Sequence, residues 1–235
     1  MTAADEMGAG DGIAERLGVV RAAIAEACAR SGRAADAATL VLASKTQPAA
    51  AIAAAYAAGA REFGENYVQE AIAKRAATAH LDGLRWHLIG HLQSNKARAA
   101  VANFALIHTL DSERLAAAIA RVRPAPAQEV LIEVKLGGEA SKHGVGPAAA
   151  EQLIAAVRGQ VIVRGLMTIP PPEAAAASAR RWFGELRELR DRLAGATGLA
   201  LSELSMGMSG DYAAAIAEGA TIVRVGRAIF GERSG

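Results

Sequence analysis

The stretch Thr39-Leu-Val-Leu-Ala-Ser-Lys-Thr-Gln-Pro48 contains the pattern that decides the fold. Its apolar and β-branched residues predict a buried strand, and Pro48 marks the start of a helix after a tight turn. Lys45 lies at the exit of this strand, where desolvation disfavours the ammonium form and lowers the pKa of the amine. A neutral amine can attack an aldehyde to form a Schiff base. The alternative is that Lys45 simply extends its side chain into solvent.

The same alternation of a short apolar run and an amphipathic helical run continues along the chain. Eight strand-then-helix units within about 200 residues are typical of a single (β/α)8 TIM barrel. An open doubly wound sheet is the alternative, but it usually carries a G-x-G-x-x-G loop after its first strand, and none follows residues 40–44. The predicted strands are 40–44, 62–64, 86–89, 105–109, 130–135, 161–167, 201–205 and 221–225.

We expect one domain over residues 13–235, because no Pro- or Ser-rich linker divides the chain. Apolar residues at helical spacing over 13–30 predict an extra N-terminal helix outside the barrel. A second long helix is predicted over 172–194. Residues 1–12 are polar, acidic and glycine-rich, so we expect a disordered tail rather than a secretory signal.

Composition argues against several classes of protein. The net charge is +2 with 21% charged residues, which is too balanced for a nucleic-acid surface. The single cysteine, Cys28, excludes an intrachain disulfide and fits a reducing compartment. The longest alanine-rich stretch, 49–60, is shorter than the ~20 apolar residues that span a bilayer. We therefore expect a cytoplasmic protein without nucleic-acid or membrane partners, and nothing in the sequence requires more than a monomer.

Polar residues gather just after the predicted strands, where barrels of this kind place their active face. The five histidines and the one cysteine lack zinc-type spacing along the chain, so no metal site is predicted. The polar residues at strand ends are Lys45, Glu65, Asn66, His91, Gln93, Asn95, Asp111, Lys142, His143, Thr168 and Ser209.

Two glycine-containing turns indicate an anion site. Residues 205–211 open a helix after the seventh strand, and residues 225–231 follow the eighth. Backbone N–H groups at a helix start bind anions, and barrels commonly hold phosphate after strands seven and eight. An ordinary capped turn is the alternative interpretation of each segment.

Two residues within the predicted strands have both a structural and a functional interpretation. Arg224 lies among residues that should be buried, and an unpaired buried charge is costly. It therefore forms a structural ion pair or contacts a ring nitrogen of a ligand. His87 is either a hydrogen-bonded core histidine or a part of the site.

Several stretches, taken together, resemble the pyridoxal phosphate homeostasis protein family from about Thr39 to Arg233. The resemblance implies a single barrel like the N-terminal domain of alanine racemases, carrying pyridoxal 5′-phosphate (PLP) on a lysine. The matching stretches are Ala43-Ser-Lys-Thr46, Phe63-Gly-Glu-Asn-Tyr-Val-Gln-Glu70, Trp86-His-Leu-Ile-Gly-His-Leu-Gln-Ser-Asn-Lys96, Ser141-Lys-His-Gly144, Arg164-Gly-Leu-Met167, Leu204-Ser-Met-Gly-Met-Ser209 and Val223-Arg-Val-Gly226.

The resemblance also implies roles for individual residues. Lys45 would carry PLP as a Schiff base, and Arg224 would face its pyridine nitrogen. Arg227 stands where the family often has Thr or Ser, and Lys135 stands where Asn is common, so a hydroxyl and an amide are missing there. The phosphate would be bound by Ser209, Gly226 and Arg227. The cofactor would be lined by Asn66, His87 and Met167.

Two functions fit such a site: a PLP carrier, or a racemase or decarboxylase. Racemases that resemble this barrel add a domain whose tyrosine supplies a second acid/base, and this chain stops shortly after Phe230, so we expect none. Arg224 at the pyridine nitrogen would keep that nitrogen unprotonated and weaken the ring as an electron sink, although racemases of this fold also use Arg there. We therefore expect a carrier that buffers PLP or delivers it to apo PLP-dependent enzymes, without efficient catalysis.

Overall fold

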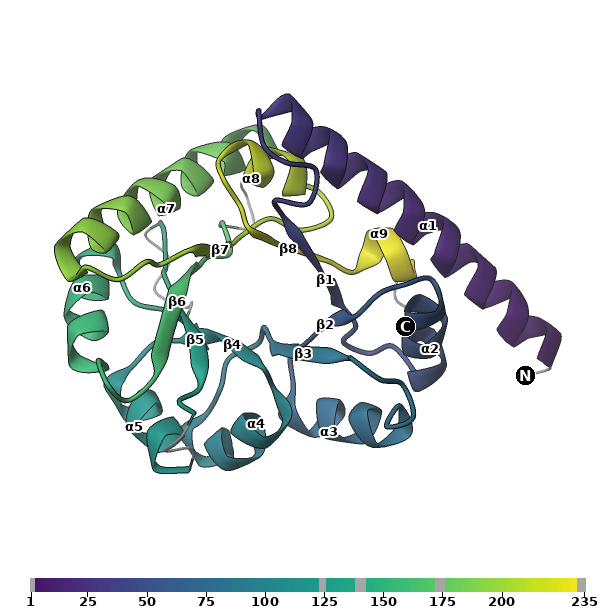
Figure 1. Ribbon diagram of the computed structural model, residues 1–235, viewed down its shortest axis with the longest axis horizontal. Helices are drawn as coiled ribbons and strands as arrows, with labels where there is room; N and C mark the ends of the chain where they lie inside the picture. Colours follow the sequence, from purple (N-terminus) through teal and green to yellow (C-terminus); the bar gives the residue numbers. More distant parts are fainter. Residues whose placement is uncertain (1–2, 123–125, 138–142, 172–175, 232–235) are drawn as a thin grey trace.

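The computed structural model describes residues 3–122, 126–137, 143–171 and 176–231. Eight parallel strands close into a barrel in the order β1 to β8, with β8 pairing back to β1. Helices α2 to α7 surround this ring of strands in Figure 1. The predicted (β/α)8 barrel is confirmed.

Each strand is short, and a helix follows it. The strands are β1 (Thr39–Ala43), β2 (Glu62–Glu65), β3 (Arg85–Leu88), β4 (Leu106–Leu110), β5 (Glu129–Glu133), β6 (Ile162–Met167), β7 (Glu203–Ser205) and β8 (Ile222–Val225). The helices are α1 (Ala3–Arg30), α2 (Ala49–Ala57), α3 (Val68–Ala77), the 3-10 turn η1 (Ser94–Lys96), α4 (Ala97–Asn103), α5 (Glu113–Val122), α6 (Pro147–Ala156), α7 (Ala176–Thr197), α8 (Tyr212–Ala217) and α9 (Arg227–Phe230).

The strand boundaries differ from the predicted ones by at most two residues, since apolar β-branched runs ending in polar residues locate buried parallel strands well. The second long predicted helix is α7, which is described from Ala176, and residues 172–175 lie outside the described residues. The helix α1 is described from Ala3, and the disordered tail over residues 1–12 stays a prediction.

The helix α1 lies along the outside of the barrel beside α8 and α9, as Figure 1 shows, and it also contacts α2. Arg16 Nε donates to the carbonyl oxygen of Ile229 at 2.6 Å. Arg21 donates to the carbonyls of Ala58 and Gly59, each at 2.8 Å. This added helix therefore supports the segment that follows β8. Within the described residues, no helix is both long and apolar enough to cross a bilayer.

The core has two layers. The larger one lies between the strands and the surrounding helices and contains Phe63 and Trp86, whose ring centroids are 5.6 Å apart. The second lies inside the barrel and has only a small apolar cluster, made of Val41, Leu106, Leu131, Met167 and Ile222. The remaining interior is polar, and it leads to the rim where the strands end.

Candidate functional site

Lys45 lies just beyond β1, at the rim of the barrel formed by the C-terminal strand ends. Ser44 before it is buried, Lys45 is half-buried, and Thr46 after it is exposed. Thr46 has a φ of 66°, a left-handed conformation that costs a β-branched residue roughly 1–2 kcal/mol. The turn that presents Lys45 is therefore strained and needs support from outside.

That support comes from a buried cluster that we call the Lys74 clamp, made of Ser44, Glu65, Glu70 and Lys74. Lys74 Nζ donates to the Ser44 carbonyl at 2.6 Å and to carboxylate oxygens of Glu65 at 2.7 Å and Glu70 at 2.6 Å. The same Glu70 oxygen accepts the backbone N–H of Thr46 at 2.5 Å. The clamp thus holds the carbonyl before Lys45 and the amide after it.

Sequence reasoning missed the role of Lys74, although Glu70 and Lys74 stand four residues apart on a helix, as ion pairs often do. Burial raises the pKa of Glu65, and the hydrogen bonds and charge of Lys74 oppose that rise. A buried carboxylate held by one buried lysine makes the clamp sensitive to loss of either partner.

The two turns predicted to bind an anion lie together and next to β1. The backbone N–H of Ala228 donates to Ser209 Oγ at 3.4 Å, which links the turn after β7 to the turn after β8. A Cβ at Gly226 would lie 2.8 Å from the carbonyl oxygen of Ala43, so only glycine allows this approach to the end of β1. Ser209 and Gly226 are half-buried, and Arg227 is exposed. Lys45 and both turns therefore share one sector of the rim.

Arg224 is buried inside the barrel, with 4% of its surface exposed. Its Nη1 donates to Ser205 Oγ at 2.6 Å and its Nη2 to the carbonyl oxygen of Thr168 at 3.0 Å. Burial lowers the pKa of Arg224 to about 10, against the opposing charges of Asp211 and Glu133, so it stays a cation at neutral pH. Both hydrogen-bond partners are neutral groups.

From Arg224 a line of hydrogen bonds, which we call the interior chain, crosses the barrel. Ser205 Oγ lies 2.9 Å from His108 Nδ1, and His108 Nε2 lies 2.9 Å from His87 Nδ1. His87 Nε2 lies 2.6 Å from Glu62 Oε2, at the start of β2 and the opposite end of the barrel. His87 therefore has partners for both ring nitrogens, as a core histidine should.

Two proton arrangements satisfy every bond of the interior chain. Burial and the charges of His87 and Arg224 hold the pKa of His108 well below 6.5, so its ring is neutral. Burial tends to raise the pKa of Glu62, but the hydrogen bond and charge of His87, with Arg85, bring it below its usual value. When His87 is neutral, each hydrogen bond of the interior chain is donated in the direction from Arg224 to Glu62. A protonated His87 donates in both directions, and His108 then donates to Ser205.

The other predicted site residues occupy varied positions. Asn66 is half-buried just after β2, and its backbone packs so closely on Gly90 that a Cβ there would lie 2.3 Å from the Asn66 oxygen. Met167 is fully buried at the end of β6, in the apolar cluster inside the barrel. Lys135 is half-buried beyond β5, and Lys142 lies outside the described residues.

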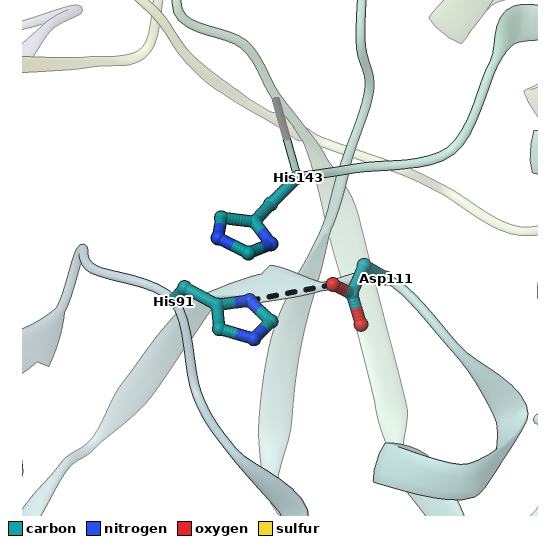
Figure 2. A group of neighbouring side chains, drawn as sticks. All are labelled: His91, Asp111 and His143. Atoms are coloured by element: carbon teal, nitrogen blue, oxygen red, sulfur yellow. Dashed lines mark ion pairs between the residues drawn. The ribbon is translucent and has the colours of Figure 1, made fainter. Parts of the chain in front are cut away.

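A second group at the rim combines His91, Asp111 and His143 from three separate segments, as Figure 2 shows. The sequence did not predict this group because its members are far apart along the chain. Their position after consecutive strands was the only sign that they would meet.

Comparisons with known proteins identify what this architecture is similar to. The alanine racemase N-terminal domain model matches residues 16–234. The pyridoxal phosphate homeostasis protein of Pseudomonas aeruginosa is 46% identical over 225 residues, covering 94% of this chain and 96% of that protein. The protein of that name from Escherichia coli is 44% identical over 229 residues, covering 94% and 97%.

Solved structures agree with these sequence relatives. PipY of Synechococcus elongatus, solved with PLP bound, is 43% identical with a TM-score of 0.83, covering 93% of this chain and 100% of that one. Alanine racemase from Corynebacterium glutamicum shares the fold, with a TM-score of 0.71 at 18% identity, and the match covers 95% of this chain and 62% of the racemase chain. The chain therefore belongs to the pyridoxal phosphate homeostasis protein family, within the wider family of the alanine racemase N-terminal domain.

Proposed function

We propose that this chain binds PLP at the rim between β1, β7 and β8, holds it as a Schiff base on Lys45, and buffers or delivers it. The observation that carries the proposal is the convergence of Lys45 with the Ser209 and Gly226 turns. The close approach of Gly226 to Ala43 fixes that convergence. The name and the bound PLP of the relatives support it.

The residues present fit this cofactor. Ser209 offers a hydroxyl, and the first amides of α9, at Gly226 and Arg227, have no acceptor within their own helix. The guanidinium of Arg224 is held by Ser205 and Thr168 and remains charged, so it suits a ring nitrogen that accepts a hydrogen bond. Bound PLP supplies an aldehyde for amines and a ring that withdraws electrons. A cation opposite the ring nitrogen keeps that nitrogen unprotonated and reduces the withdrawal.

We further propose that the chain acts as a monomeric cytoplasmic carrier for apo PLP-dependent enzymes, with little catalysis of its own. Racemisation needs an acid/base group on each face of the substrate carbon. The candidates for the second group are His87, Lys142 and His143, and of these His87 is 3% exposed and bonded to Glu62 and His108. It is therefore occupied inside the barrel rather than directed at a substrate.

The test has two arms, run on the full chain. Purified protein should show a Schiff-base absorption band that borohydride abolishes and that Lys45→Ala lacks. The same covalent adduct in Lys45→Ala contradicts the assignment to Lys45. Mixing the loaded protein with an apo-enzyme should restore activity faster than free release of PLP allows. Turnover of D- or L-amino acids near ordinary enzyme rates, ~1–10³ s⁻¹, contradicts the carrier.

A further inference from the structure

The group formed by His91, Asp111 and His143, which we call the rim triad, contains none of the residues assigned to PLP. His91 follows β3, Asp111 follows β4, and His143 precedes α6. One ligand atom from each lies within 4.8 Å of the other two. In Figure 2 the two imidazole rings lie one above the other, and the Asp111 carboxylate is beside His91.

The spacing inside the rim triad suits a shared ion better than a direct bond. His91 Nδ1 and Asp111 Oδ2 are 3.4 Å apart, which is longer than the ~2.7–3.2 Å of a hydrogen bond. Two ligands bonded to one tetrahedral Zn²⁺ at ~2.0–2.2 Å lie roughly 3.3–3.6 Å apart. The observed separation is therefore the one that two metal ligands have.

The two histidine rings of the rim triad lie face to face. Their centroids are 3.6 Å apart and their planes are at 9°, an arrangement that two imidazolium cations would oppose. Burial and the charge of His143 lower the pKa of His91, and the charge of Asp111 opposes them. The neutral imidazole is the form that binds a metal.

A buried carboxyl oxygen without a hydrogen-bond partner lies next to the segment that carries His143. Glu133 Oε2 is buried, and among the described residues it has no hydrogen-bond partner. Burial and the charge of Asp111 raise the pKa of Glu133 to about 7, against the effect of Arg224. The backbone next to His143 packs on this side chain, since a Cβ at Gly144 would lie 3.1 Å from Glu133 Cγ. Two carboxyl groups therefore lie close together where a cation would offset their repulsion.

We propose that His91, Asp111 and His143 bind one divalent transition-metal ion of the Zn²⁺, Co²⁺ or Ni²⁺ class. Two imidazoles and one carboxylate are a ligand set for such ions, whereas Mg²⁺ and Ca²⁺ prefer oxygen ligands alone. One ring must turn about its side-chain torsions to direct its nitrogen at the ion, and His143 is exposed and able to do so. The fourth position opens on a cavity of about 370 Å³ that Gln93 and Arg114 also line.

The experiment is a titration of the full chain with Co²⁺, followed by the visible bands of the ion, with equilibrium dialysis against Zn²⁺. One equivalent should bind. His91→Ala, His143→Ala and Asp111→Asn should each weaken binding at least about tenfold. Affinity should fall in acid, because protons compete with the metal for the imidazole nitrogens. His80→Ala is the matched control, because His80 is an exposed histidine outside the rim triad and should have no effect.

A second control separates this site from the PLP site. Lys45→Ala should bind Co²⁺ as the wild type does, since Lys45 belongs to another sector of the rim. Circular dichroism checks that each variant is folded. The absence of saturable binding to the wild type overturns the proposal. So does binding that persists in the His91→Ala/His143→Ala double variant, or binding that disappears in Lys45→Ala.

Discussion

Two cations are buried in the part of the chain that the structure describes, Lys74 and Arg224, and their surroundings differ. The Lys74 side chain is 8% exposed and contacts two carboxylates, Glu65 and Glu70. Arg224 is 4% exposed and contacts a hydroxyl and a carbonyl oxygen. The charge of Lys74 is neutralised within the fold, so it holds a turn in place. The charge of Arg224 is oriented but not neutralised by direct contact, so its field remains for a ligand.

The largest effect should come from breaking the Lys74 clamp. Lys74→Met leaves Glu65 buried without its cation, and we expect the free energy of unfolding to fall by about 3–5 kcal/mol. Urea unfolding measures this loss. The double variant Lys74→Met/Glu65→Gln should recover a large part of it, because no buried charge then lacks a partner. A single variant as stable as the wild type would contradict a structural role for the clamp.

Arg224→Met tests the buried cation that contacts only neutral groups. Hydrogen bonds to charged groups contribute ~1.5–3 kcal/mol, so PLP affinity should fall about 10–100-fold, with a smaller loss of stability than in Lys74→Met. Titration of the apo-protein with PLP, followed by absorbance, gives the affinity. If Arg224→Met destabilises the fold and leaves affinity unchanged, Arg224 is a structural residue like Lys74.

Glu133 sharpens the comparison because, unlike Glu65, it forms no ion pair with a lysine that the described residues show. Its pKa is raised to about 7, so between pH ~4.5 and ~7 the unfolded carboxyl is ionised while the folded one is protonated. Stability in the apo-protein therefore falls as the pH rises through this window, by roughly 1–3 kcal/mol. Glu133→Gln should remove that part of the pH dependence. Urea unfolding at pH 5 and pH 8 tests it, and identical slopes in both proteins would contradict the assignment.

The smallest effect should come from the far end of the interior chain. Glu62→Gln keeps an acceptor for His87 but removes the negative charge that Arg224 faces through three side chains. We expect PLP affinity to change about two- to fivefold, or ~0.5–1 kcal/mol. Arg85→Gln is the control. Arg85 is exposed and its Nη1 lies 3.2 Å from Glu62 Oε1, but Arg85 is not part of the interior chain. An equal effect from both variants would show that only the general charge at that end matters.

The sequence predicted the barrel and the main sector of the site for a physical reason. Parallel strands that are buried on both faces have apolar sequences, and the polar residues that follow them meet at one rim of the barrel. The order of the strands along the chain was therefore enough to place Lys45, Ser209 and Gly226 together. The resemblance added the identity of the cofactor and the role that we propose for Arg224.

The rest depended on side-chain positions that order along the chain does not determine. The sequence gives no sign that His87 and His108 are bonded to each other, since that depends on the register of β3 and β4. No metal site was predicted from the sequence, because zinc-type spacing concerns ligands on one local segment. Residues that follow three different strands can supply metal ligands without any such spacing.

The interior chain has one further consequence. Its two proton arrangements differ by a single proton on His87, and the change reverses the donor and acceptor roles at His108 and Ser205. The hydroxyl that touches Arg224 therefore belongs to the same line of hydrogen bonds as Glu62, which is partly exposed at the other end of the barrel. Side chains alone join the two ends of the barrel.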